Sequence, residues 1–327
     1  MQNFTADVSV IIPAYNPGAF LDEALRSIRA QSVPPREIIL IDDGSTPPIS
    51  IDAFSDLPIR LIRQANAGQA AARSLGIREA QCTWLAFLDA DDVWHPRKLE
   101  HQLRIASEHS RLSIIGCRAV LIDAAGQSIG SGPGNISNTI SSLDRKRFQL
   151  GAARALLVPS MVLINRAAAL ASPGFEPRYQ PIEDLAFFDN LFAAGAACAM
   201  VEKPLLKRRI HGSSLTLKYH QMLKSYLRWI ADLVRPDADP SQVAAVMAEA
   251  YLVVGLSALA CGRNDHARLL FRHARHSGST LTSILFPLLF TFIPSSMTHF
   301  ARRLKQRMCG KQALRNWGND ASDPVLC

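Results

Sequence analysis

The chain has few cysteines, and they form no recognisable pattern. Six cysteines are scattered through 327 residues without a CxxC spacing. In a chain of this size, that distribution disfavours a disulfide framework or a zinc site and favours reduced thiols in a cytoplasm. The N-terminal stretch MQNFTADVSV has neither a basic start nor a long apolar run, so we expect no secretory signal.

Other absences narrow the possible functions. No stripe of arginines and aromatic residues occurs that would suit bases, so we expect no nucleic-acid partner. No GxGxxG follows the first apolar run, which disfavours a dinucleotide dehydrogenase. The content of 48% apolar and 20% charged residues is typical of a folded protein, not of a disordered one. The net charge of +8 is compatible with an anionic substrate or an anionic lipid surface.

What the sequence does contain is an alternation of short apolar runs and helical patterns. Strands are predicted at VSVIIPAYN (8–16), REIILIDDGS (36–45), IRLIRQ (59–64) and WLAFLDADD (84–92). Between and after them, helices are predicted over 18–32, 68–80 and 96–109, the last with Pro96 in its first turn. This order indicates an α/β fold built on a doubly wound, mostly parallel sheet.

Polar side chains follow the predicted strands where each strand ends. In parallel sheets of this kind, ligands bind beyond the carboxyl ends of the strands. The residues that should meet at this edge are Tyr15 and Asn16, then Asp42 and Asp43, then Asp89, Asp91 and Asp92. We therefore predict a binding site at this edge of the sheet.

The segment LAFLDADDVW (85–94) places three carboxylates directly after a buried strand. Carboxylates this close repel one another and are rarely buried without partners. Mg²⁺ and Mn²⁺ prefer carboxylate oxygens and keep positions for water and phosphate, so a diphosphate could complete the shell. Such an ion would stabilise charge on a leaving phosphate. The alternative is a cluster of aspartates that caps a turn or a helix.

The rest of the chain divides less clearly. Strands are predicted at 113–123 and 155–166, around a loop at 126–142 that is either on the acceptor side or a plain surface connection. EDLAFFDNLFAAG (183–195) predicts a helix that stops at Gly195. Residues 217–276 are mostly helical and contain one tetratricopeptide-like helix pair, which we expect to pack on the preceding domain.

The C-terminal segment is first apolar and then basic. LTSILFPLLFTFI (281–293) is too short, and interrupted by a proline, for a confident membrane span, and RRLKQR follows at 302–307. This combination favours a helix lying on anionic lipid through 281–307, with a core helix as the alternative. We therefore predict domains at 1–216, 217–276 and 277–327, and a location at the inner face of the cytoplasmic membrane.

Five segments in order resemble the large family 2 of inverting glycosyltransferases with the GT-A fold. They are VSVIIPAYNPGAFLDEALRSIRAQS, EIILIDDGS, NAGQAAARSLGI, FLDADD and EDLAFFDNL, within a match from about Val8 to Thr216. The resemblance implies a Mn²⁺- or Mg²⁺-dependent enzyme that transfers a sugar from a nucleotide-diphospho-sugar donor. It further implies a glycan or lipid-linked acceptor in bacterial envelope polysaccharide synthesis. The QxxRW signature of the processive synthases is absent, which favours addition of a single sugar.

The resemblance also assigns roles on the donor side. The predicted nucleotide-binding residues are Pro13, Ala14, Tyr15, Asp42, Asp43, Gly68, Arg73 and Asp89, with Asp43 accepting a hydrogen bond from the base. Ser74 stands where the family more often has Asn, which weakens the assignment of Arg73. A turn-capping role is the alternative for Asp43.

On the reaction side, the resemblance points to a metal and a base. The predicted metal ligands are Asp91, with Asp89 nearer the ribose, Asp92 supporting or sharing the ligation, and His211 from a later loop, beside which Arg209 would add positive charge. Asp184 is the predicted catalytic base, and Glu183 would orient or contact the acceptor. The alternative for these two acids is a helix N-terminus complementing the dipole.

Two other functions remain open. A sugar nucleotidylyltransferase would need a Gly-rich phosphate loop with a basic residue near the N-terminus, and IIPAYNPGAF lacks one. A catalytically inactive scaffold could use the helix pair and the C-terminal segment to recruit envelope-assembly partners. Metal-dependent binding of a nucleoside diphosphate would argue against the scaffold.

Overall fold

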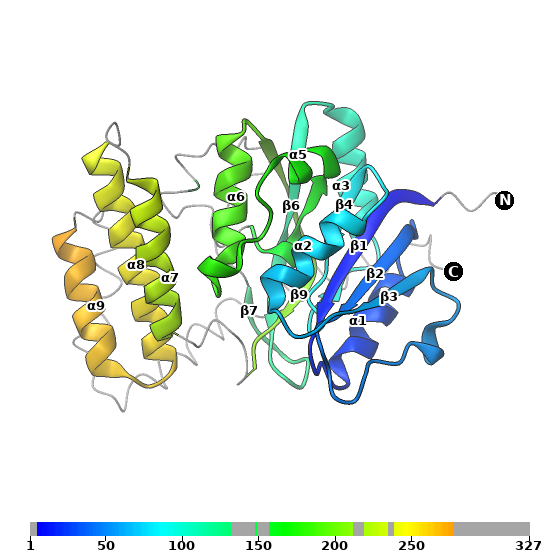
Figure 1. Cartoon of the computed structure of the whole chain (residues 1–327), viewed down its shortest axis with the longest axis horizontal. Coiled ribbons are helices and arrows are strands. Elements are labelled where there is room, and N and C mark those ends of the chain that lie inside the picture. Colours follow the sequence, from blue (N-terminus) through cyan, green and yellow to red (C-terminus); the bar gives the residue numbers. More distant parts are fainter. Residues whose placement is uncertain (1–4, 132–147, 149–156, 212–218, 235–238, 278–327) are drawn as a thin grey trace.

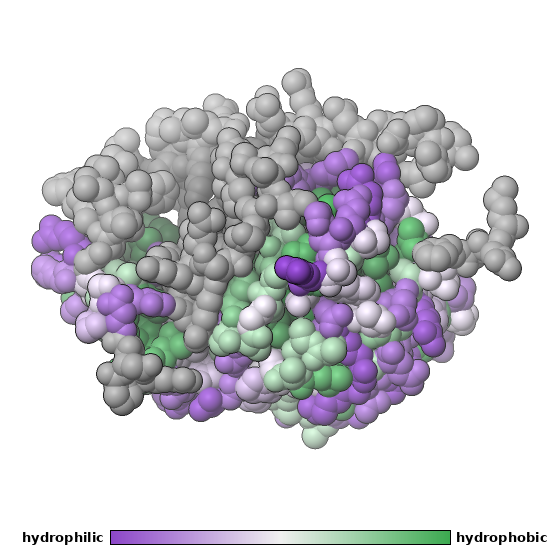
Figure 2. All heavy atoms as spheres, turned by 90° about the horizontal axis from the view of Figure 1, so that it is seen from above, coloured by the Kyte–Doolittle hydropathy of each residue, from purple (hydrophilic) through white to green (hydrophobic). Residues whose placement is uncertain are grey.

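The structure is a computed structural model that describes residues 5–131, 148, 157–211, 219–234 and 239–277. A curved sheet with helices on its faces forms the larger part, and α7, α8 and α9 stand together at one end (Figure 1). In Figure 2, hydrophilic and hydrophobic residues are both visible at the end where α8 and α9 lie. The exposed side chains of α9 include Arg268 and Asp265.

The strands of the described residues form one sheet of nine strands, in the order β3-β2-β1-β4-β8-β6-β9-β5, with β7 paired to β6. Their bounds are β1 Ala6–Ala14, β2 Pro35–Asp42, β3 Ile59–Arg63, β4 Trp84–Phe87, β5 Val93–Trp94, β6 Leu112–Ile122, β7 Ser128–Ser131, β8 Leu163–Asn165 and β9 Ala197–Arg209. The helices are α1 Phe20–Arg29, α2 Gln69–Glu79, α3 Lys98–Glu108, α5 Arg166–Ala171, α6 Glu183–Ala193, α7 Tyr219–Leu233, α8 Pro240–Ala260 and α9 Asn264–His276, with short 3-10 turns η1 Asp52–Phe54, η3 Pro159–Met161 and η4 Pro177–Tyr179.

The first four strands, β3, β2, β1 and β4, are all parallel, as predicted. The chain moves outward from β1 to β2 and β3, and then crosses back to β4 on the other side of β1. Because crossovers are right-handed, this reversal puts α1 and α2 on opposite faces of the sheet. At such a reversal, parallel sheets typically have a crevice beyond the carboxyl ends of the strands, here β1 and β4, and ligands bind in it.

The strands at this reversal are buried on both faces, which explains their continuous apolar runs. Ile11 and Ile38 are fully buried, and α1 buries its apolar face as the helical spacing predicted. A Cβ added at Gly76 of α2 would lie 2.3 Å from Ile11 Cγ2. Helix α2 therefore lies directly on β1, and this close approach holds the helix that carries Arg73.

The second half of the sheet differs in detail from the prediction. β8 is a reversed strand between β4 and β6, and it is only three residues long, because Pro159–Met161 forms a 3-10 turn instead of continuing it. Pro96 does not lie in the first turn of α3, which begins at Lys98. The segment expected as a loop from residue 126 begins with the strand β7, and residues 132–142 lie outside the described part.

The C-terminal helices form the predicted pair with one helix between it and the sheet. α8 and α9 pack on each other, and a Cβ at Gly255 of α8 would lie 2.5 Å from Phe271 Cε1 of α9. α8 packs on α7, and α7 contacts η4 of the preceding domain. The Tyr179 hydroxyl donates to Asp232 Oδ2 at 2.6 Å, and Ser225 Oγ donates to the Gln180 carbonyl at 2.7 Å. The pair therefore joins the sheet domain mainly through α7.

By length and composition, residues Pro240–Leu259 of α8 could cross a membrane, with a mean hydropathy of 1.6. That is weak support for a span, because core helices of folded proteins pass the same test, and α8 lies between α7 and α9 (Figure 1). The predicted lipid-contacting segment 281–307 lies outside the described residues, as does the predicted boundary at 216–217. Cys82, Cys117 and Cys198 of the described part are buried free thiols.

Candidate active site

The turn after β4 carries Asp89, Asp91 and Asp92 at the carboxyl edge of the parallel strands. The Leu88 amide donates to the Ile11 carbonyl at 3.0 Å, which continues the β1–β4 pairing up to the turn. The Asp89 amide then donates to Ser160 Oγ at 2.9 Å. The turn is thus anchored on both sides, and its three carboxylates enter different surroundings.

Asp92 points inward and supports the turn. Asp92 is 3% exposed, and its Oδ1 accepts a hydrogen bond from the Arg209 amide at 2.9 Å. Burial, together with the negative charges of Asp91 and Asp89, raises the pKa of Asp92 to about 8. Of the two roles predicted for Asp92, this position suits support and offers no exposed oxygen for ligation.

Asp91 and His211 meet although 120 residues separate them. Nε2 of His211 lies 2.8 Å from Oδ2 of Asp91, and the two side chains are 18% and 32% exposed. Burial and the charge of Asp89 raise the pKa of Asp91, and the contact with His211 acts in the opposite direction. The structure thus brings together two of the four residues that we predict to face a cation.

Arg73 is buried, and it joins two acidic motifs. Its side chain is 3% exposed, with Nη2 at 2.6 Å from Asp89 Oδ1 and Nη1 at 2.9 Å from Glu183 Oε1. The guanidinium carbon also lies 5.3 Å from the centre of the Phe175 ring. In the structure, both terminal nitrogens of Arg73 bind carboxylates of the chain, and its contact with a nucleotide stays a prediction.

Glu183 and Asp184 open α6 and differ in exposure. Glu183 is 2% exposed, and burial raises its pKa to about 7 even though Arg73 favours the charged form. Asp184 is partly exposed, and its Oδ1 accepts from the Leu185 amide at 2.8 Å. Burial also raises the pKa of Asp184. Asp184 is therefore the carboxylate that an incoming molecule can reach, and Glu183 is held behind it.

The carboxylates of Asp42 and Asp43 accept hydrogen bonds from other residues of the chain. Asp43 is 3% exposed; its Oδ1 accepts from Gln64 Nε2 at 2.7 Å and from the Ala67 amide at 2.9 Å, and its Oδ2 accepts from the Gly68 amide at 2.9 Å. Asp42 Oδ1 accepts from the Ser45 amide at 2.8 Å. The Asp43 carboxylate thus holds the loop that leads into α2, whereas Asp42 is the residue that caps the turn after β2. The contact of Asp43 with a base stays a prediction.

Tyr15 and Gly68 border the crevice. Pro13 and Ala14 are the last residues of β1, and Tyr15 after them is 56% exposed. Gly68 has φ +88°, and a Cβ there would lie 2.7 Å from Gln180 Oε1. A side chain at position 68 would therefore be strained and would collide with Gln180, which explains the glycine. The exposed ring of Tyr15 offers a flat face to a planar ligand.

The donor set suits a hard cation that shares its ligands with a phosphate. Among the described residues, no three His, Cys, Asp or Glu side chains lie together as a complete metal site. Mg²⁺ in phosphate-transfer sites commonly takes one or two carboxylates and fills its shell with water and phosphate oxygens. The partly exposed carboxylate of Asp91, beside His211, fits that incomplete set, with Asp89 24% exposed on the same turn.

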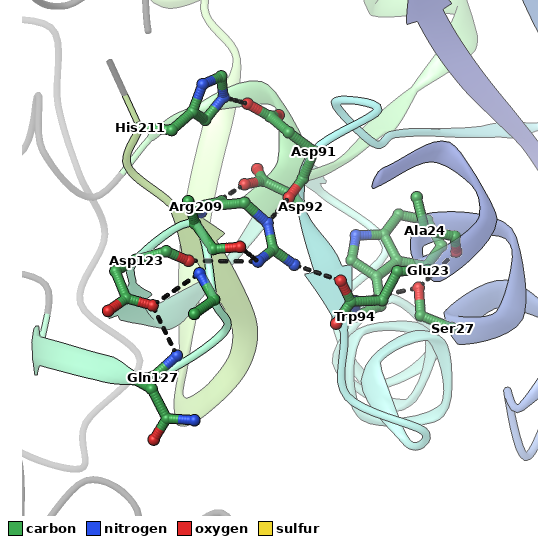
Figure 3. Close-up of polar contacts among 12 residues, drawn as sticks. Glu23, Ala24, Ser27, Asp91, Asp92, Trp94, Asp123, Gln127, Arg209 and His211 are labelled. Carbon is green, nitrogen blue, oxygen red and sulfur yellow. Dashed lines mark hydrogen bonds and ion pairs between the residues drawn. The ribbon is translucent and has the colours of Figure 1, made fainter. Parts of the chain in front are cut away.

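Sequence reasoning missed the residues that hold this site in place. Ser160 fixes Asp89 through its hydroxyl and accepts from Trp94 Nε1 through its carbonyl at 3.1 Å. Arg209 had been expected to add charge near a phosphate, but its side chain is 2% exposed and is bonded inside the fold, partly to Glu23 (Figure 3). Ser160 stands outside the five family-like segments, and Glu23 stands in the first of them without a predicted role, so the fold was needed to identify both.

Comparison with known proteins agrees with this arrangement. Residues 9–170 match the family described as Glycosyl transferase family 2. A putative glycosyltransferase of Bacillus subtilis, EpsH, is 29% identical over 67% of this chain and 65% of its own length. An uncharacterized glycosyltransferase of Rickettsia felis is 43% identical over 32% of this chain and 18% of its own length. The chain therefore spans less than two thirds of these curated relatives.

Solved structures share the fold at low sequence identity. Mannosyltransferase PcManGT from Pyrobaculum calidifontis, in complex with GDP-Man and Mn²⁺, has a TM-score of 0.56 at 14% identity and covers 93% of this chain and 87% of that one. S. aureus TarS 1–349, in complex with UDP, has a TM-score of 0.54 at 15% identity over 83% and 89%. With the mixed sheet and the acidic turn after β4, these findings show that residues 9–170 form a glycosyltransferase family 2 domain and that the chain has a GT-A fold.

Proposed function

We propose that the protein is a metal-dependent inverting glycosyltransferase that moves one sugar from a nucleotide-diphospho-sugar donor to a glycan or glycolipid acceptor. The observation that carries this proposal is the bridge made by Arg73. One buried guanidinium binds Asp89 of the acidic turn and Glu183 of the α6 motif, so the accessible Asp184 stands next to the turn that carries Asp91. A base and a cation-binding carboxylate are thus parts of one site.

The donor would occupy the crevice beyond β1 and β4. Tyr15 would lie against the base, with Pro13 and Ala14 beside it and the loop held by Asp43 closing the opposite side. Related folds have been solved with UDP and with GDP-Man, which supports a nucleotide donor in this crevice. Asp91 and His211 would hold Mn²⁺ or Mg²⁺, and the bound ion would stabilise the charge that develops on the diphosphate.

Transfer in this site needs one base. Asp184 accepts the proton of the acceptor hydroxyl as its oxygen bonds to the anomeric carbon from the side opposite the diphosphate. The bond between the anomeric carbon and the diphosphate oxygen breaks, and the nucleoside diphosphate leaves with the electron pair, so no acid is required. Glu183, fixed by Arg73, positions the start of α6 and with it Asp184.

Binding and turnover test the proposal together. Titration calorimetry with UDP and with GDP, each with and without Mn²⁺, should show binding that the metal strengthens. Turnover is then measured with a panel of nucleotide-sugars and lipid-linked acceptors. Asp91→Ala should lose metal-dependent binding, whereas Asp184→Asn should keep binding and lose transfer. Absent or metal-independent binding by the wild type would instead favour a scaffold.

We also propose that the enzyme works at the inner face of the cytoplasmic membrane in envelope polysaccharide synthesis, such as lipopolysaccharide, capsule or exopolysaccharide. The net charge of +8 and the apolar-then-basic sequence at 281–307 support contact with anionic lipid. Flotation with vesicles of phosphatidylglycerol, compared with phosphatidylcholine, tests it. Equal recovery of the protein with both lipids would reject the electrostatic contact.

A further inference from the structure

Arg209 is the last residue of β9, two positions before His211, and it joins three separate segments (Figure 3). Its Nε donates to the Asp91 carbonyl at 2.9 Å, and its backbone amide donates to Asp92 Oδ1 at 2.9 Å. Its Nη2 donates to the carboxylate of Glu23 on α1. Arg209, which stands at the start of the segment that leads to His211, thus contacts the acidic turn and α1, the first two of these segments.

The third segment is the turn between β6 and β7. Arg209 Nη1 donates to the carbonyls of Asp123 and Ala124, each at 3.2 Å. That turn is already held by its own hydrogen bonds, in which Asp123 Oδ1 accepts from the Ala125 and Gln127 amides at 2.9 Å. The carbonyls therefore face Arg209 from a fixed turn, and the guanidinium has little freedom to move.

Helix α1 supplies both the counter-charge and an aromatic support. Phe20 and Glu23 are three residues apart, so they lie on the same side of the helix. The Arg209 guanidinium carbon lies 4.6 Å from the centre of the Phe20 ring, and the rings of Phe20 and His211 have centroids 5.4 Å apart. Phe20 thus contacts both Arg209 and His211, and Glu23 neutralises the buried guanidinium.

We propose that the Glu23–Arg209 ion pair is a positioning device that sets the distance between Asp91 and His211 before a cation binds. The inference rests on the proposed function, because it assumes that these two residues face the cation. Without Glu23, Arg209 would be a buried charge with no counter-charge, and the fork that fixes the Asp91 carbonyl would shift. Groups that orient metal-binding side chains typically affect metal affinity by 10- to 100-fold.

Mn²⁺ affinity in the presence of UDP or GDP, measured by calorimetry, tests this role apart from catalysis. Glu23→Gln should weaken Mn²⁺ binding at least tenfold in protein that circular dichroism shows to be folded. Asp22→Asn is the matched control on the same helix: its carboxylate makes only an exposed contact with Arg26 at 3.8 Å, and Mn²⁺ binding should not change. Wild-type affinity in Glu23→Gln would overturn the proposal.

A second variant covers the case in which Glu23→Gln does not fold. Glu23→Leu combined with Arg209→Met removes both charges, so no buried charge is left without its partner. This double variant should fold and still bind Mn²⁺ at least tenfold more weakly; unchanged affinity would overturn the positioning role. If the wild type itself binds no Mn²⁺ with either nucleotide, the proposed function fails, and the positioning role fails with it.

Discussion

Arg73 and Glu183 form an ion pair of 2.9 Å in which both side chains are 3% exposed. The two residues are 110 positions apart in sequence, and their ion pair connects α2 with the first turn of α6. Because Arg73 also binds Asp89, one guanidinium sets the distance between the acidic turn after β4 and the first turn of α6. A charge alone cannot do this; the planar fork of arginine is required.

Arg73→Lys tests whether the site needs the two-pronged guanidinium group that binds Asp89 and Glu183 at once. Lysine keeps the positive charge but presents one point donor, so it cannot hold Asp89 and Glu183 at once with the same geometry. We expect kcat to fall by about two orders of magnitude, as for other small misplacements of reacting groups. The measurement is steady-state transfer on a protein whose unfolding is checked by circular dichroism. Wild-type kcat in this variant would show that the bridge is not needed.

The pH dependence of transfer should follow Asp184. Burial raises the pKa of this carboxyl above the ordinary aspartate value of 3.8, and only the deprotonated form can accept a proton. The kcat should therefore fall as pH falls through that raised pKa, at a pH above 3.8. A pH profile of kcat with saturating donor measures this limb. In Asp184→Asn the limb should vanish from the residual activity; its persistence would assign the limb to another group.

The sequence predicted the parallel half of the fold well because its signal is local. Apolar strands such as that ending at Ala14, and the amphipathic pattern of α1, are determined by burial of neighbouring residues. The position of Asp184 at a helix start was equally readable. The reversed strand β8 was not, because three residues carry no period and their direction is set by the partners β4 and β6.

The sequence predicted which residues lie in the candidate site better than it predicted which atoms they contact. Asp91 and His211 were expected near each other, but sequence does not show which oxygen of a carboxylate is already occupied. We predict that Arg73 and Asp43 both contact the nucleotide, and in the structure the side chains of both form hydrogen bonds with other residues of the chain. The partners of these side chains are 16 or more positions away in sequence, so only the folded structure reveals them.

Gly255 tests the packing of α8 on α9. A Cβ at this position would lie 2.5 Å from Phe271 Cε1, in a contact where Phe271 is 6% exposed. Overpacking of this kind costs about 1–3 kcal/mol, which should exceed the roughly 1 kcal/mol that alanine gains over glycine in a helix. Gly255→Ala should therefore lower the free energy of unfolding. In a Phe271→Leu background the same change should be neutral or stabilising; equal effects in both backgrounds would mean that the two residues are not coupled.

Lys98 gives the protein a measurable dependence of stability on alkaline pH. Its side chain is fully buried, with Nζ 2.7 Å from Gln102 Oε1 and 4.3 Å from the centre of the Trp94 ring. Burial without a carboxylate partner lowers the pKa of Lys98 from 10.5 to about 8. Between these two values the unfolded chain holds a proton that the folded protein has released, so stability rises with pH across this window.

Lys98→Met removes this titration. Relative to the variant, the wild type should gain on the order of 3 kcal/mol in the free energy of unfolding between pH 8 and pH 10.5, at about 1.4 kcal/mol per pH unit. Urea unfolding at half-unit steps of pH measures the difference, and subtraction of the two curves cancels the titration of every other group that the substitution leaves unchanged. Lys224→Met, at an exposed position of α7, is the matched control and should show no such gain. Parallel curves for the wild type and Lys98→Met would mean that the buried amine keeps its charge through the whole range, held by Gln102 and the Trp94 ring.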